Sequence, residues 1–200
     1  ELQSLGLQYS DPPKSFEGFG QKVRTPDVVM RERAATCLDS TVLAASCLAA
    51  AGLSPLIFLV RGHAFPGWWI HPHPHRLLAH LLGEDEQTGL KRQMLRPGTI
   101  TNINDFQTFA AAGLIGSFES TKIANPTVTY KDVEARHIDF STGDGANAFE
   151  SIVEVERVSE TGVRRLPNRT QVVGQQHFEI DIDRSEFEVL RPEIFEVEEV

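Results

Sequence analysis

The chain has 200 residues, of which 40% are hydrophobic and 24% charged, a composition typical of a soluble globular protein that buries its own core. Its net charge of −9 is uneven: residues 1–140 carry 14 acidic and 13 basic side chains, whereas residues 141–200 carry 14 acidic and 6 basic ones. Nucleic-acid binding requires clustered Lys and Arg, and a membrane span requires about 20 mostly apolar residues. We therefore expect neither direct nucleic-acid binding nor membrane insertion.

The chain has two cysteines, Cys37 and Cys47. If both lie on one helix, their separation along its axis is about 15 Å. A disulfide requires Cα atoms within about 7 Å, so the two cannot pair with each other. Two free thiols predict a reducing compartment, most simply the cytoplasm.

The first half of the chain predicts a lead-in followed by two helices. Residues 1–20 are rich in turn formers and are expected to be extended. "RTPDVVMRERAA" favours a short helix with Thr25 as its N-cap and Pro26 at its first position. A second helix is predicted over 38–51, with a capping box formed by Thr36 and Asp39 and a stop at Gly52. Small or apolar residues occur on every face of this helix, which predicts a central, buried position.

The rest of the chain mixes strand and helix patterns. The predicted strands are "SPLIFLV", with "HAFPGWWI" as its hairpin partner or its continuation, then "IGSFESTKI" at 115–123 and "ESIVEVERV" at 150–158. The predicted helices are 76–96 and "INDFQTFAAAGL" at 103–114. The pattern of "TYKDVEARHIDF" at 129–140 fits either a helix or a strand, and we favour a helix. The intervening "HPHPH" is expected to be irregular, and the acidic tail 177–200 is expected to be an edge strand or a linker.

A candidate reactive site follows from the position of Cys37. A thiol at the first turn of a helix faces unpaired N–H groups and the positive end of the helix dipole. Both lower the cysteine pKa from about 8.5 and favour the nucleophilic thiolate. His63 follows after a helix, a turn and a strand, so packing of that strand on the helix can bring the two side chains together. A packed core cysteine remains the alternative at this point.

Residues 20–69, "GQKVRTPDVVMRERAATCLDSTVLAASCLAAAGLSPLIFLVRGHAFPGWW", resemble the cysteine- and histidine-bearing half of the transglutaminase-like superfamily. They are most similar to the transglutaminase-like domain near the start of large bacterial helicase-type proteins. "GSFEST" and "FESIVEVERVSETGVRRLP" resemble later parts of that domain, so the resemblance covers about 8–167. It implies an α+β fold of papain-like type, with the Cys-bearing helix packed on an antiparallel sheet. The expected organisation is a lead-in 1–20, a domain 21–167 and an acidic extension or linker 168–200.

The resemblance also implies catalytic roles. Cys37 would be the nucleophile, His63 the general base and acid, and Glu119 the carboxylate that orients the imidazole. Asp105 and Glu134 are the alternative third members. The resemblance implies no cofactor.

Other residues are candidates for supporting roles. The backbone N–H of Cys37 and the side-chain amide of Gln21 are expected to bind the oxyanion of the reaction. Asp39 is expected to cap its helix rather than to act as a catalytic acid. Trp68 and Trp69 would either wall a substrate groove or pack in the core.

Three closely spaced histidines, His71, His73 and His75, resemble metal ligands, but they lie in a proline-kinked segment without a Cys or carboxylate partner. We therefore expect no metal site here. Cys47 is expected to be a core thiol.

The expected function is cysteine-dependent acyl transfer on an amide or isopeptide bond, with hydrolysis favoured over cross-linking. The enzyme would act on a protein or peptide substrate and would be one domain of a larger bacterial parent chain. The alternative is a catalytically inactive peptide-binding or scaffolding module of a helicase-type protein.

Overall fold

The computed structural model of the chain describes residues 2–11, 23–85, 98–125, 127–129, 131 and 148–160. By its internal contacts the chain divides into Glu1–Arg165 and Leu166–Val200, and every described residue belongs to the first unit. Within that unit helices pack on an antiparallel sheet, so the expected α+β class is confirmed. None of the described helices is long and apolar enough to span a membrane. The predicted boundary between 21–167 and 168–200 lies outside the described residues.

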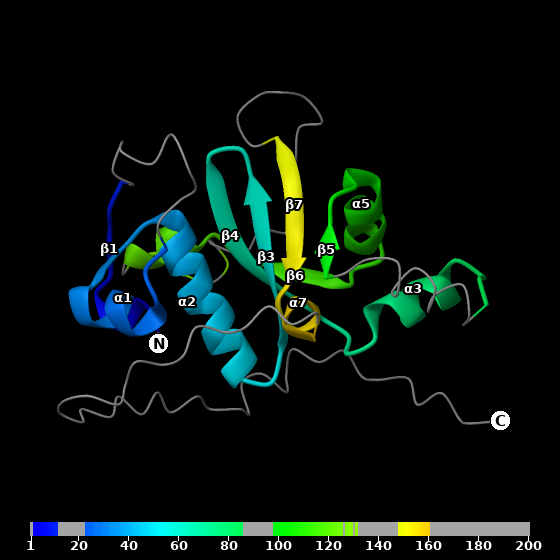
Figure 1. Cartoon of the computed structure of the whole chain (residues 1–200), viewed down its shortest axis with the longest axis horizontal. Helices are drawn as coiled ribbons and strands as arrows, with labels where there is room; N and C mark the ends of the chain where they lie inside the picture. The colour runs from blue at the N-terminus through cyan, green and yellow to red at the C-terminus, as the bar shows by residue number, and fades with distance from the viewer. Residues whose placement is uncertain are drawn as a thin grey trace. The chain divides into compact units, whose positions relative to one another are not determined.

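The main sheet has five strands in the order β5-β7-β3-β4-β6, and every neighbouring pair is antiparallel (Figure 1). Of the two alternatives for "HAFPGWWI", the hairpin partner is correct, because β3 and β4 pair along their whole length. Gly62, with φ +78°, makes the tight turn between them. The strands are β3 (Ser54–Val60), β4 (His63–Trp69), β5 (Thr99–Ile100), β6 (Ile115–Ser117) and β7 (Phe149–Glu154).

The main core lies between this sheet and two helices, α3 (Pro74–Leu81) and α5 (Ile103–Ala111). The Phe58 ring stacks on the Phe65 ring with 4.8 Å between centroids, and Phe106 meets Phe58 edge-on at 5.8 Å. A Cβ at position 67 would lie 2.4 Å from the Phe58 ring, so the sheet packs this closely only because that residue is glycine. The predicted helix over 103–114 is confirmed for most of its length.

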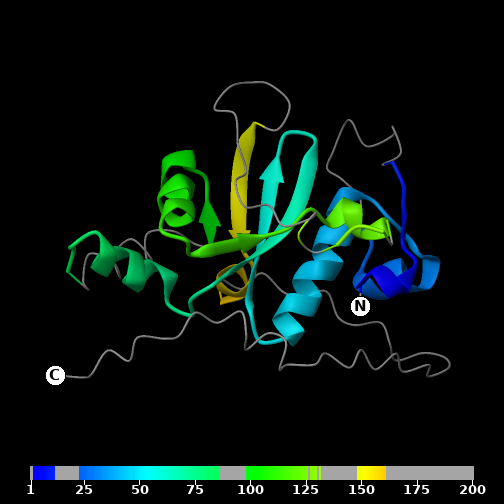
Figure 2. The same cartoon turned by 180° about the vertical axis from the view of Figure 1, so that it is seen from behind.

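The helix α2 (Cys37–Ala50) lies against β3 and β4, as Figures 1 and 2 show. The predicted capping box is present: the Asp39 N–H donates to Thr36 Oγ1 at 3.2 Å, and the Thr36 N–H donates to Asp39 Oδ2 at 3.0 Å. At the other end Gly52 takes φ +83°, and its N–H donates to the Ala49 carbonyl. Most residues of the first three turns are buried, as expected for a central helix.

The N-terminal residues belong to the fold. After the short 3₁₀ helix η1 (Leu2–Leu5), β1 (Gln8–Tyr9) pairs in parallel with β2 (Ala34–Ala35). Leu7, which is 6% exposed, packs in a second apolar cluster with Val29 of α1 (Pro26–Glu32). Thr25 and Pro26 start α1 as predicted. The described part of the expected lead-in is therefore tied to the domain by a buried leucine and by strand pairing.

Two predicted strands end early. The strand pattern over 115–123 would place Glu119 on one face with Ser117 and Thr121, but β6 ends at Ser117 and a 3₁₀ helix, η3 (Ser120–Ala124), follows. The prediction is correct over Ile115–Ser117 and wrong from Glu119 onward, because the Glu119 side chain caps η3 by accepting from the Thr121 N–H.

The strand predicted over 150–158 is correct only as far as Glu154. Residues Val155–Glu160 form a helix, α7, whose turn brings Arg157 Nη1 to 3.0 Å from Glu154 Oε1. This i,i+3 ion pair requires a helical turn rather than an extended strand.

The segment "HPHPH" is irregular at 71–73, but α3 begins at Pro74 and includes His75. Proline suits the first turn of a helix, where its missing N–H leaves no hydrogen bond unmade. The helix predicted over 76–96 is correct only as far as Leu81, because the chain turns at Gly83, which takes φ +69°. The remaining predictions for 86–97, for 130 and 132–140 and for 161–200 lie outside the described residues.

Candidate active site

Cys37 is the first residue of α2, directly after its N-cap Thr36. The side chain is 7% exposed. Its sulfur accepts hydrogen bonds from the backbone N–H groups of Leu38, on the same helix, and of Ala64, on β4. The thiol therefore lies at the point where the start of α2 meets the start of β4.

His63 is the first residue of β4, next to the hairpin turn, with Val60 as its partner on β3. Its imidazole hydrogen-bonds the Cys37 thiol. The Nε2 atom of the same ring lies 2.8 Å from Glu119 Oε2. Because the ring has only two nitrogens, Nδ1 is the atom that is available to hydrogen-bond the Cys37 sulfur.

Glu119 reaches His63 because β6 runs along β4. Ser117 pairs with Gly67, the Phe118 N–H donates to the Pro66 carbonyl, and the chain continues toward the His63 end of β4. The carboxylate uses its two oxygens separately: Oε2 faces His63, while Oε1 accepts from Thr121 N at 2.9 Å and from Thr121 Oγ1 at 2.7 Å. The threonine therefore fixes the plane of the carboxylate that orients the imidazole.

The electrostatics of the three side chains favour a thiolate–imidazolium pair. Hydrogen bonds that the His63 ring donates to the Cys37 sulfur and to the Glu119 carboxylate raise the pKa of His63 to about 10. The hydrogen bond from His63 lowers the pKa of Cys37 below its ordinary value, against the opposing effect of burial. Burial also opposes ionisation of Glu119, but hydrogen bonds from His63 and Thr121 keep the pKa of that carboxyl below its usual range.

Asp39 supports the start of the helix and does not contact the thiol among the described interactions. Its side chain is completely buried and accepts from Thr36 N, from Arg24 N and from Arg24 Nη1, the last two at 2.7 Å. Burial would raise the pKa of Asp39, but these donors hold it below its ordinary value. The geometry is that of the predicted helix cap, with Arg24 as a further partner.

A cluster of buried hydroxyl groups connects Cys37 to the segment that carries Glu119. The Cys37 carbonyl accepts from Ser40 Oγ at 3.0 Å and from Thr41 Oγ1 at 2.7 Å. Both hydroxyls also lie within hydrogen-bond distance of Ser120 Oγ, at 3.1 and 3.3 Å. The sequence reasoning missed these residues, although a Ser-Thr pair follows closely after both Cys37 and Glu119.

The two tryptophans do not join this site. Trp69 is 5% exposed and packs edge-on against Phe109, so it is a core residue rather than a groove wall. Trp68 is half-buried and its ring contacts that of Phe118. Along an extended strand these residues lie roughly 15–20 Å from His63, which is too far to contact the same reacting bond.

The structure describes only some of the other predicted site residues. Gln21 and Glu134 lie outside the described residues, so their proposed roles stay predictions. Asp105 lies in the first turn of α5. The described partner of His63 Nε2 is Glu119, which was the first choice for the third residue.

Tyr9 is a neighbour of the site that the sequence did not indicate. Burial raises the pKa of its phenol, and the negative charges of Cys37, Asp11 and Glu119 raise it further. The side chain nevertheless remains 48% exposed. No local pattern points to it, because it reaches the site only through the pairing of β1 with β2.

The three histidines of "HPHPH" do not converge. His71 Nδ1 accepts from the His73 N–H, whereas the buried His75 faces away to Glu154, with 3.3 Å between Nε2 and Oε2. Among the described residues no group of three His, Cys, Asp or Glu side chains is arranged to hold a metal ion.

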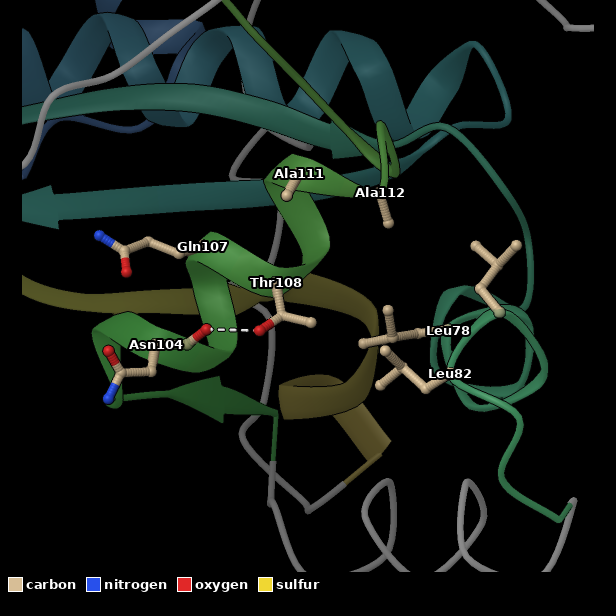
Figure 3. Close-up of a pocket in the computed structure, with 8 residues that line it drawn as sticks. Leu78, Leu82, Asn104, Gln107, Thr108, Ala111 and Ala112 are labelled. Atoms are coloured by element: carbon tan, nitrogen blue, oxygen red, sulfur yellow. Dashed lines mark hydrogen bonds between the residues drawn. The ribbon is translucent and has the colours of Figure 1, made fainter.

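An open groove of about 600 Å³ lies between α3 and α5 (Figure 3). Its lining includes Leu78 and Leu82 on one side and Thr108 on the other, and none of the residues that contact Cys37 or His63. It is therefore separate from the Cys37 site.

No family model matches this chain, and no curated protein or solved structure is significantly similar to it.

Proposed function

We propose that the chain is a cysteine-dependent acyl-transfer enzyme of transglutaminase-like, papain-like type, with Cys37, His63 and Glu119 as its catalytic residues. The observation that carries the proposal is the continuous hydrogen-bonded series from the Cys37 thiol through His63 to the Glu119 carboxylate. Nucleophile, base and orienting group are the three parts that covalent acyl transfer requires.

The proposed reaction begins with the thiolate of Cys37. Its electron pair forms a bond to the carbonyl carbon of an amide, and the carbonyl π electrons move to oxygen. As the tetrahedral intermediate collapses, the C–N bond breaks and the His63 imidazolium gives its proton to the leaving amine. In the second half, His63 takes a proton from the incoming acceptor, which attacks the thioester and releases Cys37.

We propose water as the acceptor, which makes the reaction hydrolysis, because nothing in the described residues or in the sequence pattern selects an amine. A protein or peptide substrate, and a place within a larger bacterial helicase-type protein, are proposed on the strength of the sequence resemblance alone. We do not favour the alternative, an inactive binding or scaffolding module. A binding module does not require an imidazole that hydrogen-bonds both a thiol and a carboxylate.

The test compares the two cysteines of the same chain. At pH 6 iodoacetamide should alkylate Cys37 at least tenfold faster than Cys47, because a paired thiol is ionised there and an ordinary one, with a pKa of about 8.5, is not. His63→Ala should remove this difference. Peptide mapping by mass spectrometry measures both sites in one sample. Equal rates at Cys37 and Cys47 would contradict the proposal and would favour the inactive module.

A further inference from the structure

Tyr9 is held beside the catalytic residues by strand pairing. The Gln8 N–H donates to the Arg33 carbonyl at 2.8 Å, and the Ser10 N–H donates to the Ala35 carbonyl at 2.9 Å. This register places Tyr9 opposite Ala35, two residues before Cys37. Strand β1 also contacts η3, the element that Glu119 caps.

The phenol of Tyr9 is suited to donate a hydrogen bond. Burial, together with the charges of Cys37, Asp11 and Glu119, raises its pKa, so the hydroxyl stays protonated wherever the thiolate of Cys37 exists. About half of the side chain is exposed. Only burial and nearby charges, and no hydrogen bond to a described residue, raise the pKa of its hydroxyl. A donor near the sulfur is therefore available to a bound molecule.

We propose that the Tyr9 hydroxyl donates a hydrogen bond to the carbonyl oxygen of the acyl group while Cys37 attacks it. The inference rests on the proposed function and adds a residue to it. An oxyanion needs donors beyond the backbone N–H of Cys37, and the two nitrogens of His63 are already engaged by Cys37 and Glu119. Tyr9 keeps its own proton throughout, so the proton given to the leaving group still comes from His63.

The test uses two reagents that differ in whether an oxyanion forms. Iodoacetamide alkylates the thiolate by displacement at a saturated carbon, and no oxyanion develops. 4-Nitrophenyl acetate acylates it by addition to a carbonyl, which places negative charge on oxygen. The reaction at Cys37 is followed by nitrophenol release and by peptide mapping for the acetate, and by peptide mapping for iodoacetamide.

Tyr9→Phe keeps the ring and removes only the hydroxyl. We expect it to slow acetylation of Cys37 by about tenfold, less than the loss of an enclosed oxyanion donor because Tyr9 is half-exposed. Its alkylation rate and the pH dependence of that rate should match the wild type within twofold. Gln8→Ala, on the same strand, is the control and should leave both rates unchanged.

Two outcomes would overturn the role of Tyr9 alone. Unchanged acetylation in Tyr9→Phe would mean that the hydroxyl does not contact the oxyanion. An equal loss in both reactions would mean that Tyr9 acts on the thiolate or on the local fold. If the wild-type Cys37 reacts no faster than Cys47 with either reagent, the proposed function fails first, and the role of Tyr9 fails with it.

Discussion

Replacing Glu119 by Gln tests how strongly the carboxylate controls the thiol. Gln keeps the size of the side chain, and its amide oxygen can still accept from Thr121, but the charge facing His63 is lost. A hydrogen bond to a charged group is worth about 1.5–3 kcal/mol, and one pKa unit corresponds to about 1.36 kcal/mol. Both side chains are about a quarter exposed, at 25% for His63 and 26% for Glu119. The loss of this hydrogen bond to a charge corresponds to a fall of about one to two pKa units. Because both side chains are partly exposed, we expect the pKa of His63 to fall by about one unit.

The effect on Cys37 follows from the coupling of the pair. Glu119 favours the imidazolium, and the imidazolium favours the thiolate, so loss of the carboxylate raises the apparent pKa of thiolate formation. At a pH below this apparent pKa, the alkylation rate should drop about tenfold for every pH unit by which the titration midpoint rises. Above pH 10 the thiol is ionised in both proteins, and their rates should converge.

The assay is the rate of iodoacetamide alkylation at Cys37 between pH 5 and pH 11. Glu150→Gln, which removes one exposed carboxylate from β7, is the matched control and should follow the wild-type profile. A Glu119→Gln profile that superimposes on the wild type would refute the reasoning. Circular dichroism of both variants separates a changed pKa from a loss of fold.

Two further predictions concern stability, measured by urea unfolding. Asp39→Asn should cost about 2 kcal/mol at pH 7, because a buried charge that pairs with Arg24 is lost. Since the folded pKa of Asp39 is lowered, this advantage exists above its unfolded pKa of about 3.9 and is lost as the pH falls through the folded value. A gap that does not shrink as the pH is lowered below about 3.9 would contradict the assignment. Glu154→Ala should cost about 3 kcal/mol, because it leaves Arg157 and the buried His75 without their shared carboxylate, while alkylation of Cys37 stays unchanged. A loss below about 1 kcal/mol would show that this network contributes little.

Features that depend on neighbouring residues were predictable from the sequence. The start of α2 follows from Thr36 and Asp39, which satisfy each other's backbone N–H groups across one turn. The β3–β4 hairpin follows from two apolar runs that flank the Gly62 turn. These interactions operate within a few residues, so local patterns are enough to recognise them.

Features that depend on distant pairing were not predictable in the same way. Tyr9 lies opposite Ala35, two residues before Cys37, only because β1 pairs with β2, and both strands are two residues long. Ser120 meets Ser40 only after β6 has aligned on β4. A residue's role at such a site is determined by register between strands, and a short strand carries too few residues to reveal its register.

The sequence suggested two causes of thiolate stabilisation, the helix start and His63, and both lower the pKa of Cys37. The position of Cys37 at a helix start indicated unpaired N–H groups and the helix dipole, but that same turn carries the carboxylate of Asp39, which would oppose a second negative charge. Arg24 lies 2.7 Å from this carboxylate and offsets its charge. The largest favourable contribution is instead the hydrogen bond from His63. Thiolate reactivity should therefore depend first on the alignment of β4 with α2, and only second on the helix end itself.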